Sequence, residues 1–339
     1  MYICRRFLYK TRFYTMLCIY NPSTDPYFNL AAEEYFLDCC KEDVFMLWRN
    51  EPAIIVGKFQ NSLAEINLDY VQEKNIKVVR RQTGGGAVFH DLGNLNFTFI
   101  ETDSNGNFQT FTEPILKVLN QLGVDARFEG RNDLTINGMK FSGNAQCVHH
   151  NRTLHHGTLL FAAEMTDLSQ ALKVNPLKFQ DKAVKSVRKR VTNISEHLAD
   201  RNFTVMDLKD AIMQYVKSTN TNAVSYELTD SDKASIRRLV KEKYSTWEWN
   251  FGSSPRYTFQ KADKTSAGMV EVYLCIEKAC IQEVRIFGDF FSIKDVHELE
   301  NLLKGLPHNR ERILNVLNTI NVGDYIRNIS VMDFIDLLF

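Results

Sequence analysis

Three consecutive glycines, residues 84–86, stand between two strand-like segments in the sequence RRQTGGGAVFHDLGNLNF at residues 80–97. Because glycine has no Cβ, the backbone can adopt positive φ here and can touch another group directly. Successive backbone N–H groups in such a turn can bind an oxygen-rich anion, and Arg80 and Arg81 add positive charge beside it. The pattern predicts an anion-binding turn, while a strained turn or bulge with surface arginines is the structural alternative.

Two common nucleotide-binding motifs do not fit this turn. A Walker loop requires G-x-x-x-x-G-K-[ST], and a dinucleotide-binding turn requires G-x-G-x-x-G at the start of a helix. Here residues 87–91 and 94–101 follow as strand candidates, so no helix begins after the glycines. We therefore set both classes aside.

Composition limits the class of protein. The 339 residues are 44% hydrophobic, which predicts one large or two ordinary globular domains. Basic and acidic residues balance at 41 each, and no apolar run is long enough to span a bilayer, so we expect neither a nucleic-acid nor a membrane partner. The seven cysteines contain no C-x-x-C pair, which favours reduced thiols in the cytoplasm over a disulfide or zinc framework.

The first 15 residues, MYICRRFLYKTRFYT, carry four basic residues and no acid. Organellar presequences share this bias, but Met16 is also a candidate start, with an extension upstream of it. We interpret residues 1–15 as an unstructured extension and leave them out of the fold.

The rest of the chain alternates between helix and strand patterns. Asp25 is a candidate N-cap, Pro26 suits a first helical turn, and the pair Asn137 and Gly138 predicts a tight hairpin turn. The predicted helices are 25–42 and 108–123, and the predicted strands are 16–20, 44–50, 53–59, 76–82, 87–91, 94–101, the hairpin 133–148, and 155–162.

After residue 165 the pattern is mostly helical as far as a seam at 245–259, STWEWNFGSSPRYTF. A strand pair at 268–288 and two or three helices follow. We predict a mixed α/β protein with an extension at 1–15, a larger domain at 16–255 and a smaller α+β domain at 256–339.

Two further segments carry candidate chemistry. Lys140 lies just after the hairpin turn on a predicted strand, so its charge would be rigidly placed, and it could hold a carboxylate and an α-phosphate together during adenylation. A lysine in a hairpin is otherwise a solvated surface residue. His155 and His156 lie on opposite faces of a strand, so one of them can point into a pocket, and neither has neighbours that would complete a zinc site.

These segments, in this order, resemble the lipoate-protein ligase A family. The matching pieces are LWRN (47–50), RRQTGGGAVFHDLGN (80–94), GRNDLTINGMKFSGNAQ (130–146), HHGTLLF (155–161), SVRKRVTNISE (186–196) and WEWNFG (247–252). The resemblance runs from Met16 to Phe339. It implies a catalytic domain like those of biotin-protein ligases and, distantly, class II aminoacyl-tRNA synthetases, with a C-terminal accessory domain.

The resemblance implies a two-step reaction. ATP and lipoate, with Mg²⁺, give lipoyl-AMP and pyrophosphate, and the acyl group then passes to a lysine of a lipoyl domain, in a 2-oxoacid dehydrogenase E2 subunit or the glycine-cleavage H protein. The implied ATP-binding residues are Arg81, Gly86, Ala87, Val88, Phe89 and Lys140; the lipoate and adenylate residues are Trp48, Thr83, Asn132, Asp133, Lys140, Ser142 and His156; Lys140 is catalytic, and Asp133 is the candidate Mg²⁺ carboxylate. We expect a monomer.

The chain departs from the family pattern at Thr83 and at Asn144, Gln146 and Cys147, which leaves open whether octanoate competes with lipoate. One alternative function is an octanoyl or lipoyl transferase that works through a cysteine thioester, for which Cys147 is the candidate. Another is a non-catalytic binding module. A basic run from Lys182 to Arg190 either contacts ATP phosphates or an acidic acceptor, or forms a solvated loop.

Overall fold

The computed structural model describes residues 15–60, 62, 66–104, 106–164, 191–251, 259–277 and 280–339. The predicted N-terminal extension up to residue 14, the basic run 182–190 and the predicted helical stretch 165–190 lie outside these ranges. The predicted domain boundary at residue 255 lies outside them too, and it stays a prediction.

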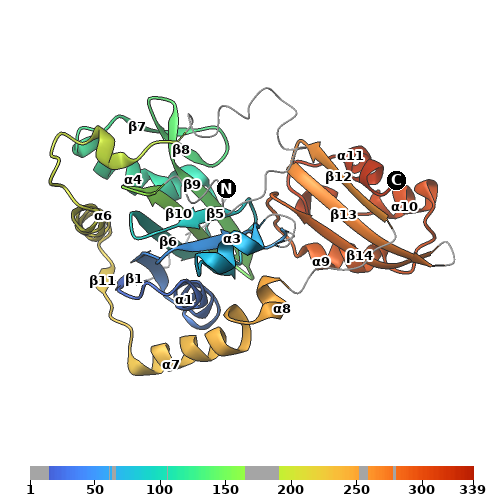
Figure 1. Ribbon diagram of the computed structural model, residues 1–339, viewed down its shortest axis with the longest axis horizontal. Coiled ribbons are helices and arrows are strands. Elements are labelled where there is room, and N and C mark those ends of the chain that lie inside the picture. The colour runs from blue at the N-terminus through green and yellow to red at the C-terminus, as the bar shows by residue number, and fades with distance from the viewer. Residues whose placement is uncertain are drawn as a thin grey trace, which may run out of the picture.

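An eight-stranded mixed sheet forms the centre of the larger part (Figure 1). Its spatial order is β11-β1-β2-β6-β10-β9-β8-β7, with β1 parallel to both of its neighbours and the other pairs antiparallel. The strands are β1 (Met16–Asn21), β2 (Asp43–Trp48), β6 (Asn94–Thr102), β7 (Ala126–Glu129), β8 (Asp133–Ile136), β9 (Met139–His149), β10 (Arg152–Leu160) and β11 (Ala223–Ser225).

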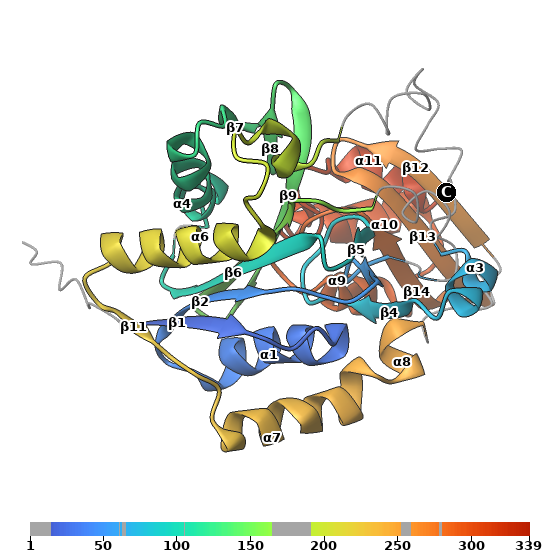
Figure 2. The same ribbon diagram turned by 60° about the vertical axis from the view of Figure 1, so that its left-hand side comes forward.

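Helices cover both faces of this sheet, as Figure 2 shows. On one face lies α1 (Pro26–Cys39), whose N-cap Asp25 accepts a hydrogen bond from the Tyr27 N–H, as the sequence predicts. The other face carries α4 (Phe108–Gln121) and α6 (Val205–Thr219). The remaining elements of this part are α3 (Leu68–Glu73), the 3-10 turn η2 (Ile194–His197), α7 (Asp230–Leu239), the π-helical turn η3 (Val240–Tyr244) and α8 (Trp247–Asn250).

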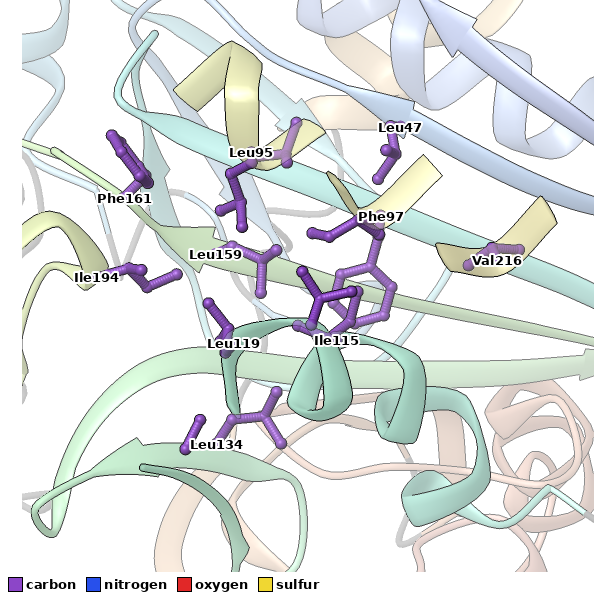
Figure 3. Packing of buried hydrophobic residues seen from close by; sticks show 14 of the residues in the cluster. Leu47, Leu95, Phe97, Ile115, Leu119, Leu134, Leu159, Phe161, Ile194 and Val216 are labelled. Carbon is purple, nitrogen blue, oxygen red and sulfur yellow. The ribbon is translucent and has the colours of Figure 1, made fainter. Parts of the chain in front are cut away.

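Alternation along β6 decides which face is the core. Leu95 and Phe97 point toward α4 and α6 (Figure 3). Phe99 packs on Phe111 of α4, and all three belong to the largest hydrophobic cluster of the described residues. The intervening Asn96 and Thr98 therefore point to the opposite face, under α1, where polar residues are unusual unless they are hydrogen-bonded. This polar row forms the floor of the site described below.

A second, three-stranded sheet lies beside α1, in the order β4-β3-β5. Its strands are β3 (Ala53–Val56), β4 (Lys77–Arg80) and β5 (Val88–His90), so the glycine triplet joins two strands, as the sequence predicts. The hairpin β8–β9 also forms as predicted, with φ of 53° at Asn137 and 73° at Gly138, the signs that a primed two-residue turn requires.

The C-terminal unit, residues 259–339, has its own sheet and its own hydrophobic cluster (Figure 1). Its sheet has three strands, β12 (Phe259–Thr265), β13 (Gly268–Glu277) and β14 (Cys280–Gly288), followed by α9 (Val296–Leu303), α10 (Arg310–Leu317), the 3-10 turn η4 (Val322–Asp324) and α11 (Val331–Leu337). The sequence predicted a strand pair only, because the polar residues of β12 gave no apolar alternation. The predicted mixed α/β class with a smaller C-terminal part is confirmed. Within the described ranges, every helix is too short or too polar to cross a membrane.

Candidate active site

Two cavities adjoin each other where β9 meets the glycine turn. We call the first the acyl cavity, after the ligand that the family resemblance implies for its residues, a space of about 210 Å³ over β2, β6 and β10. We call the second the nucleotide cavity, again after the ligand that the resemblance implies, a space of about 610 Å³ between β5 and the β8–β9 hairpin. The two cavities share the lining residues Ala87, Val88, Lys140, Gly143 and Thr158. Lys140 is the only residue with a charged side chain among these five, so it stands between two spaces of different size.

The floor of the acyl cavity is a row of residues that runs across the sheet. Trp48 pairs with Asn96, Asn96 with Thr158, Thr158 with Gly143, and Gly143 with Asp133. Directly paired residues of a sheet project from the same face. A ligand that lies along this row therefore crosses five strands at their pleated surface.

The ammonium group of Lys140 is held in position by neighbouring residues. Its Nζ lies 2.6 Å from Asp133 Oδ1, and both side chains are 39% exposed. The Thr192 N–H donates to the Lys140 carbonyl at 2.9 Å, which fixes the strand from its other side. Gly143 leaves room for the lysine chain, because a Cβ there would lie 3.1 Å from Nζ. An ammonium has three N–H donors, so contact with Asp133 leaves two of them for other anions.

Behind the cavity wall lies a buried carboxylate, Glu33 of α1, which is 2% exposed. The Trp48 Nε1–H donates to Thr98 Oγ1 at 2.9 Å, and the Thr98 hydroxyl donates to Glu33 at 2.6 Å. His156 Nδ1 lies 2.9 and 3.1 Å from the two Glu33 oxygens. A carboxylate only accepts, so Nδ1 carries the imidazole proton, and in the neutral ring Nε2 is left as an acceptor.

The chain of hydrogen bonds continues to the glycine turn. His156 Nε2 lies 2.8 Å from the Thr83 hydroxyl, which accepts a hydrogen bond from Arg81 Nε at 2.9 Å. Arg81 also donates to the carbonyl groups of Ile55, Gly84 and Gly86. A continuous set of hydrogen-bonded side chains therefore runs from Trp48 in the acyl cavity to the glycine turn.

Both arginines of the motif are buried, contrary to the surface position of the structural alternative. Arg80 binds the carbonyl groups of Gly57, Lys58 and Gln60 and those at the end of α8, so its guanidinium serves packing rather than an anion. Among the described residues, acceptors are present for four of the five Arg81 N–H groups, and the side chain lines the acyl cavity. Burial lowers the pKa of each to about 10, so both are charged at neutral pH.

The three glycines have three different surroundings. A Cβ on Gly84 would lie 2.2 Å from the Phe290 carbonyl oxygen, and Gly85 has φ of 94° and donates its N–H to that same oxygen at 3.1 Å. Around Gly86 the nearest atom to such a Cβ would be 3.8 Å away. The sequence suggested that a ligand needs the bare backbone at all three positions, whereas at Gly84 the close neighbour is the C-terminal unit.

The C-terminal unit reaches the site through residues 288–291. Phe290 stacks on Phe59 with ring centroids 4.9 Å apart, and Gly288 N–H donates to the Phe59 carbonyl. Phe291 lines the acyl cavity and carries the Arg131 guanidinium 4.7 Å from its ring centroid. This segment therefore contributes to the cavity wall, although the sequence offered no signal for it.

The structure brings the sequence-predicted residues around these two cavities. Trp48, Arg81, Gly86, Ala87, Val88, Asn132, Lys140 and His156 line the acyl cavity; Ala87, Val88, Phe89, Asp133, Lys140 and Ser142 line the nucleotide cavity; Thr83 lies behind both, bonded to His156. Sequence reasoning missed Glu33, His90, Asn96 and Phe291. The signal for Glu33 was an acid between Leu30 and Leu37 on the buried stripe of a helix.

The two histidines of β10 differ, as strand alternation requires. His156 lines the acyl cavity, whereas His155 is fully buried and stacks on Phe111 at 4.8 Å. Burial lowers the pKa of His155, so it stays neutral. His90, also in the acyl cavity, accepts from Asn50 at Nδ1 and therefore donates from Nε2 to Thr158, and burial lowers its pKa to about 3.

Cys147 does not suit thioester chemistry. Desolvation raises the pKa of its thiol to about 12, and no histidine or lysine is bonded to it among the residues described. The nucleophile of a thioester mechanism is a thiolate, which requires a lowered pKa. This argues against the transferase alternative.

Metal binding would rest on one carboxylate. No three His, Cys, Asp or Glu side chains cluster as a metal site in the described part of the chain. Mg²⁺ that accompanies a nucleotide is usually held by one or two carboxylates and the phosphates. Asp133, in the nucleotide cavity, fits that arrangement, because its side chain is 39% exposed and therefore accessible to an ion.

The chain matches known proteins over nearly its whole length. Residues 25–217 match the model of the lipoyl protein ligase A/B catalytic domain, and residues 254–338 match that of the bacterial lipoate protein ligase C-terminus. Lipoate-protein ligase LplJ of Bacillus subtilis is 43% identical over 335 residues, 96% of this chain and 100% of that protein.

Two solved structures have a similar fold. One is P. falciparum LipL1 in complex with lipoate, with a TM-score of 0.79 at 26% identity over 95% of this chain and 97% of that one. The other is a lipoate-protein ligase A bound with ATP, with a TM-score of 0.60 at 28% identity over 70% of this chain and 98% of that one.

Proposed function

This chain belongs to the lipoate-protein ligase A family of enzymes, and we propose that it activates lipoate with ATP to lipoyl-AMP and transfers the lipoyl group to a lysine of a lipoyl domain. The observation that carries the proposal is the position of Lys140, whose side chain lines both the acyl cavity and the nucleotide cavity.

In the first step, a carboxylate oxygen of lipoate attacks the α-phosphorus of ATP, and pyrophosphate leaves. Two anions must approach each other, which is unfavourable without a cation between them. Lys140 can donate one N–H to the carboxylate and one to the α-phosphate while it keeps Asp133. Charge that develops on the phosphoryl oxygens then meets a cation that is already in place.

The Asp133–Lys140 ion pair does not hold the lysine away from substrate. Partly exposed pairs of this kind contribute only about 0 to 1 kcal/mol, so their partners can be shared or exchanged at little cost. The pair instead orients the ammonium before substrate arrives. Asp133 is also the carboxylate that would hold Mg²⁺ at the phosphates, where the ion would neutralise charge on the leaving pyrophosphate.

The cavities divide the substrate between them. The acyl cavity, walled by Trp48, Leu30 and Ile55, would take the apolar chain of lipoate, and Arg81 has one N–H left for the adenylate. The nucleotide cavity, which includes Ala87, Val88 and Phe89, would take the phosphates and ribose. The narrow space excludes water from the mixed anhydride, which is otherwise hydrolysed.

In the second step, the ε-amine of an acceptor lysine attacks the carbonyl carbon, and AMP leaves. The bond broken is the carbonyl C–O bond of the mixed anhydride, so the enzyme needs no covalent intermediate. We propose lipoyl domains of 2-oxoacid dehydrogenase E2 subunits or the glycine-cleavage H protein as acceptors. A cytoplasmic monomer stays our prediction for the working form.

The test separates the two steps. The purified protein is incubated with ATP, Mg²⁺ and lipoate, and pyrophosphate release is measured with and without a lipoyl domain. We expect lipoate-dependent pyrophosphate release without acceptor and a mass increase of the lipoyl domain when it is present. Lipoylation of the acceptor in the absence of ATP would contradict the proposal and favour a transferase.

A further inference from the structure

One polar side chain in the acyl cavity has no hydrogen-bond partner within the described part of the chain. Asn96 is 1% exposed, and neither its amide oxygen nor its amide nitrogen is bonded to a described residue. Its amide offers two N–H donors and one acceptor, and buried groups of this kind are almost always satisfied in folded proteins. Because Asn96 lines the acyl cavity, the occupant of that cavity is the natural source of its partner.

The neighbouring polar groups of the same cavity are satisfied by the protein itself. Trp48 donates to Thr98, His90 is bonded on both ring nitrogens, and the Asn144 amide donates to the Asn132 carbonyl. Asn96 lies in register between Trp48 and Thr158, and neither of them bonds its amide. The unsatisfied amide is therefore a local feature of one position, not a general property of the cavity.

The position of Asn96 along the cavity can be derived from the sheet. Gly143, Thr158 and Asn96 are paired in register on β9, β10 and β6, so Asn96 lies two strand spacings, about 10 Å, from Gly143. Lys140 Nζ lies over Gly143, 3.1 Å from where its Cβ would be. The distance from the Lys140 ammonium to Asn96 is therefore close to the distance of about 10 Å between Gly143 and Asn96.

A lipoate molecule matches this distance. A carboxylate bound to the Lys140 ammonium lies about 3 Å from it. Between the carboxyl carbon and the five-membered ring are five carbon–carbon bonds of about 1.5 Å, which span roughly 6 Å when the chain is extended. The dithiolane ring then lies beside Asn96, and the aliphatic chain lies over Thr158.

We propose that Asn96 is a specificity-determining residue, which donates an N–H hydrogen bond to a dithiolane sulfur and so favours lipoate over straight-chain fatty acids. The inference rests on the proposed function, since it needs the carboxylate at Lys140. Sulfur is a weak acceptor, but a straight-chain acid of eight carbons offers none and leaves the buried amide unpaired. A site rejects an analogue when that analogue leaves one of its buried polar groups unsatisfied.

The test compares three acids, chosen so that the effect of the ring shape can be distinguished from the effect of the sulfur atoms. These are lipoate, 5-cyclopentylpentanoate, which has a five-membered ring without sulfur, and octanoate. Pyrophosphate release gives kcat/KM for each acid with the wild-type protein and with Asn96→Leu, which has the same branched side-chain shape but no amide. We expect the preference for lipoate over the cyclopentyl acid to fall about tenfold in the variant, with activity on the two sulfur-free acids retained or raised.

Two controls keep the result interpretable. Asn144→Leu removes an amide that the protein already satisfies, so it should lower kcat/KM for all three acids by a similar factor. If Asn96→Leu does not fold, as judged by thermal unfolding, Asn96→Ala is assayed in its place, and calorimetry measures its binding of lipoate and the cyclopentyl acid without ATP.

The outcomes are distinct. A selective loss for lipoate supports the role of Asn96. An equal loss for the three acids, or an unchanged ratio, contradicts it and leaves the ligase proposal standing. Failure of the wild-type protein to release pyrophosphate with ATP and any of the acids would instead contradict the proposed function itself.

Discussion

The acyl cavity and the nucleotide cavity meet at Lys140 but are built differently. The acyl cavity has a floor of strand residues. Two residues of its lining, Trp48 and His156, are linked to the buried Glu33 by hydrogen bonds, Trp48 through Thr98 and His156 directly. The nucleotide cavity is larger, lies between β5 and the β8–β9 hairpin, and presents Lys140 and Asp133 at 39% exposure each. The acyl cavity is backed by buried hydrogen bonds, and the nucleotide cavity presents an accessible ion pair.

This difference has a physical reason. An apolar chain is bound through shape, so its site gains from rigid strands and from polar groups that, with the exception of Asn96, are satisfied before it enters. A triphosphate is bound through charge and backbone N–H groups, which must remain accessible to it. At the turn, however, the Gly85 N–H already bonds the Phe290 carbonyl, so the C-terminal unit occupies one donor of the predicted anion site.

The largest expected effect is at the junction of the two cavities. Lys140→Ala should slow adenylate formation by about 10²-fold or more, because one preorganised contact to developing charge is lost. The measurement is lipoate-dependent pyrophosphate release. Lys77→Ala is the matched control, since Lys77 is a lysine of similar exposure that pairs with Asp25 and Glu51 away from the site. Near-normal release from folded Lys140→Ala protein would remove the lysine from the mechanism.

The buried hydrogen-bond network beside the acyl cavity is tested at Glu33. Glu33→Gln keeps the shape but replaces an acceptor that serves both Thr98 and His156. We expect a loss of about 1 to 3 kcal/mol in the free energy of unfolding, because a buried group is left unsatisfied. We also expect the substitution to raise the KM for lipoate more than it raises the KM for ATP. Urea unfolding and initial rates measure the two effects. If the KM for ATP rises instead, the network serves the nucleotide cavity and the division drawn here is wrong.

Contact between the glycine turn and the C-terminal unit is tested at Gly84. Gly84→Ala places a Cβ 2.2 Å from the Phe290 carbonyl, so residues 288–291 must move, at a cost typical of overpacking, about 1 to 3 kcal/mol. We expect ATP-dependent activation to fall more than transfer from supplied lipoyl-AMP, and deletion of residues 260–339 to act in the same direction. Gly86→Ala is the control for stability, because its nearest neighbour is 3.8 Å away. Equal losses in both assays would show that the C-terminal unit serves both steps.

The smallest effect is expected at Cys147. Its thiol, with a pKa raised to about 12 by burial, stays protonated from pH 6 to 9. Cys147→Ser should therefore leave ligation within about twofold of wild type, since no acyl-enzyme is required. Intact-protein mass spectrometry after incubation with lipoate and ATP checks this. A thioester adduct that is absent from the variant would restore the transferase alternative.

Local patterns in the sequence predicted most of the elements that carry the site. Asp25 before Pro26 predicted the start of α1, and Asn137 with Gly138 predicted the hairpin turn that positions Lys140. Local patterns predicted a residue's role less well where that role depends on residues far away in the sequence. Arg80 was interpreted as an anion ligand, but it binds backbone carbonyls at residues 57–60 and at the end of α8, which no local pattern contains.

Strand β6 shows where the sequence stops being sufficient. The alternation of Asn94, Asn96 and Thr98 with Leu95, Phe97 and Phe99 determined that one face of this strand is polar and the other apolar. Alternation ordinarily means that the polar face is solvated. Only the packing of α1 and the small sheet over that face made it the floor of a cavity, with Asn96 at 1% exposure. Periodicity is a property of neighbouring residues, whereas burial of the polar face is decided by whichever distant element lies on it.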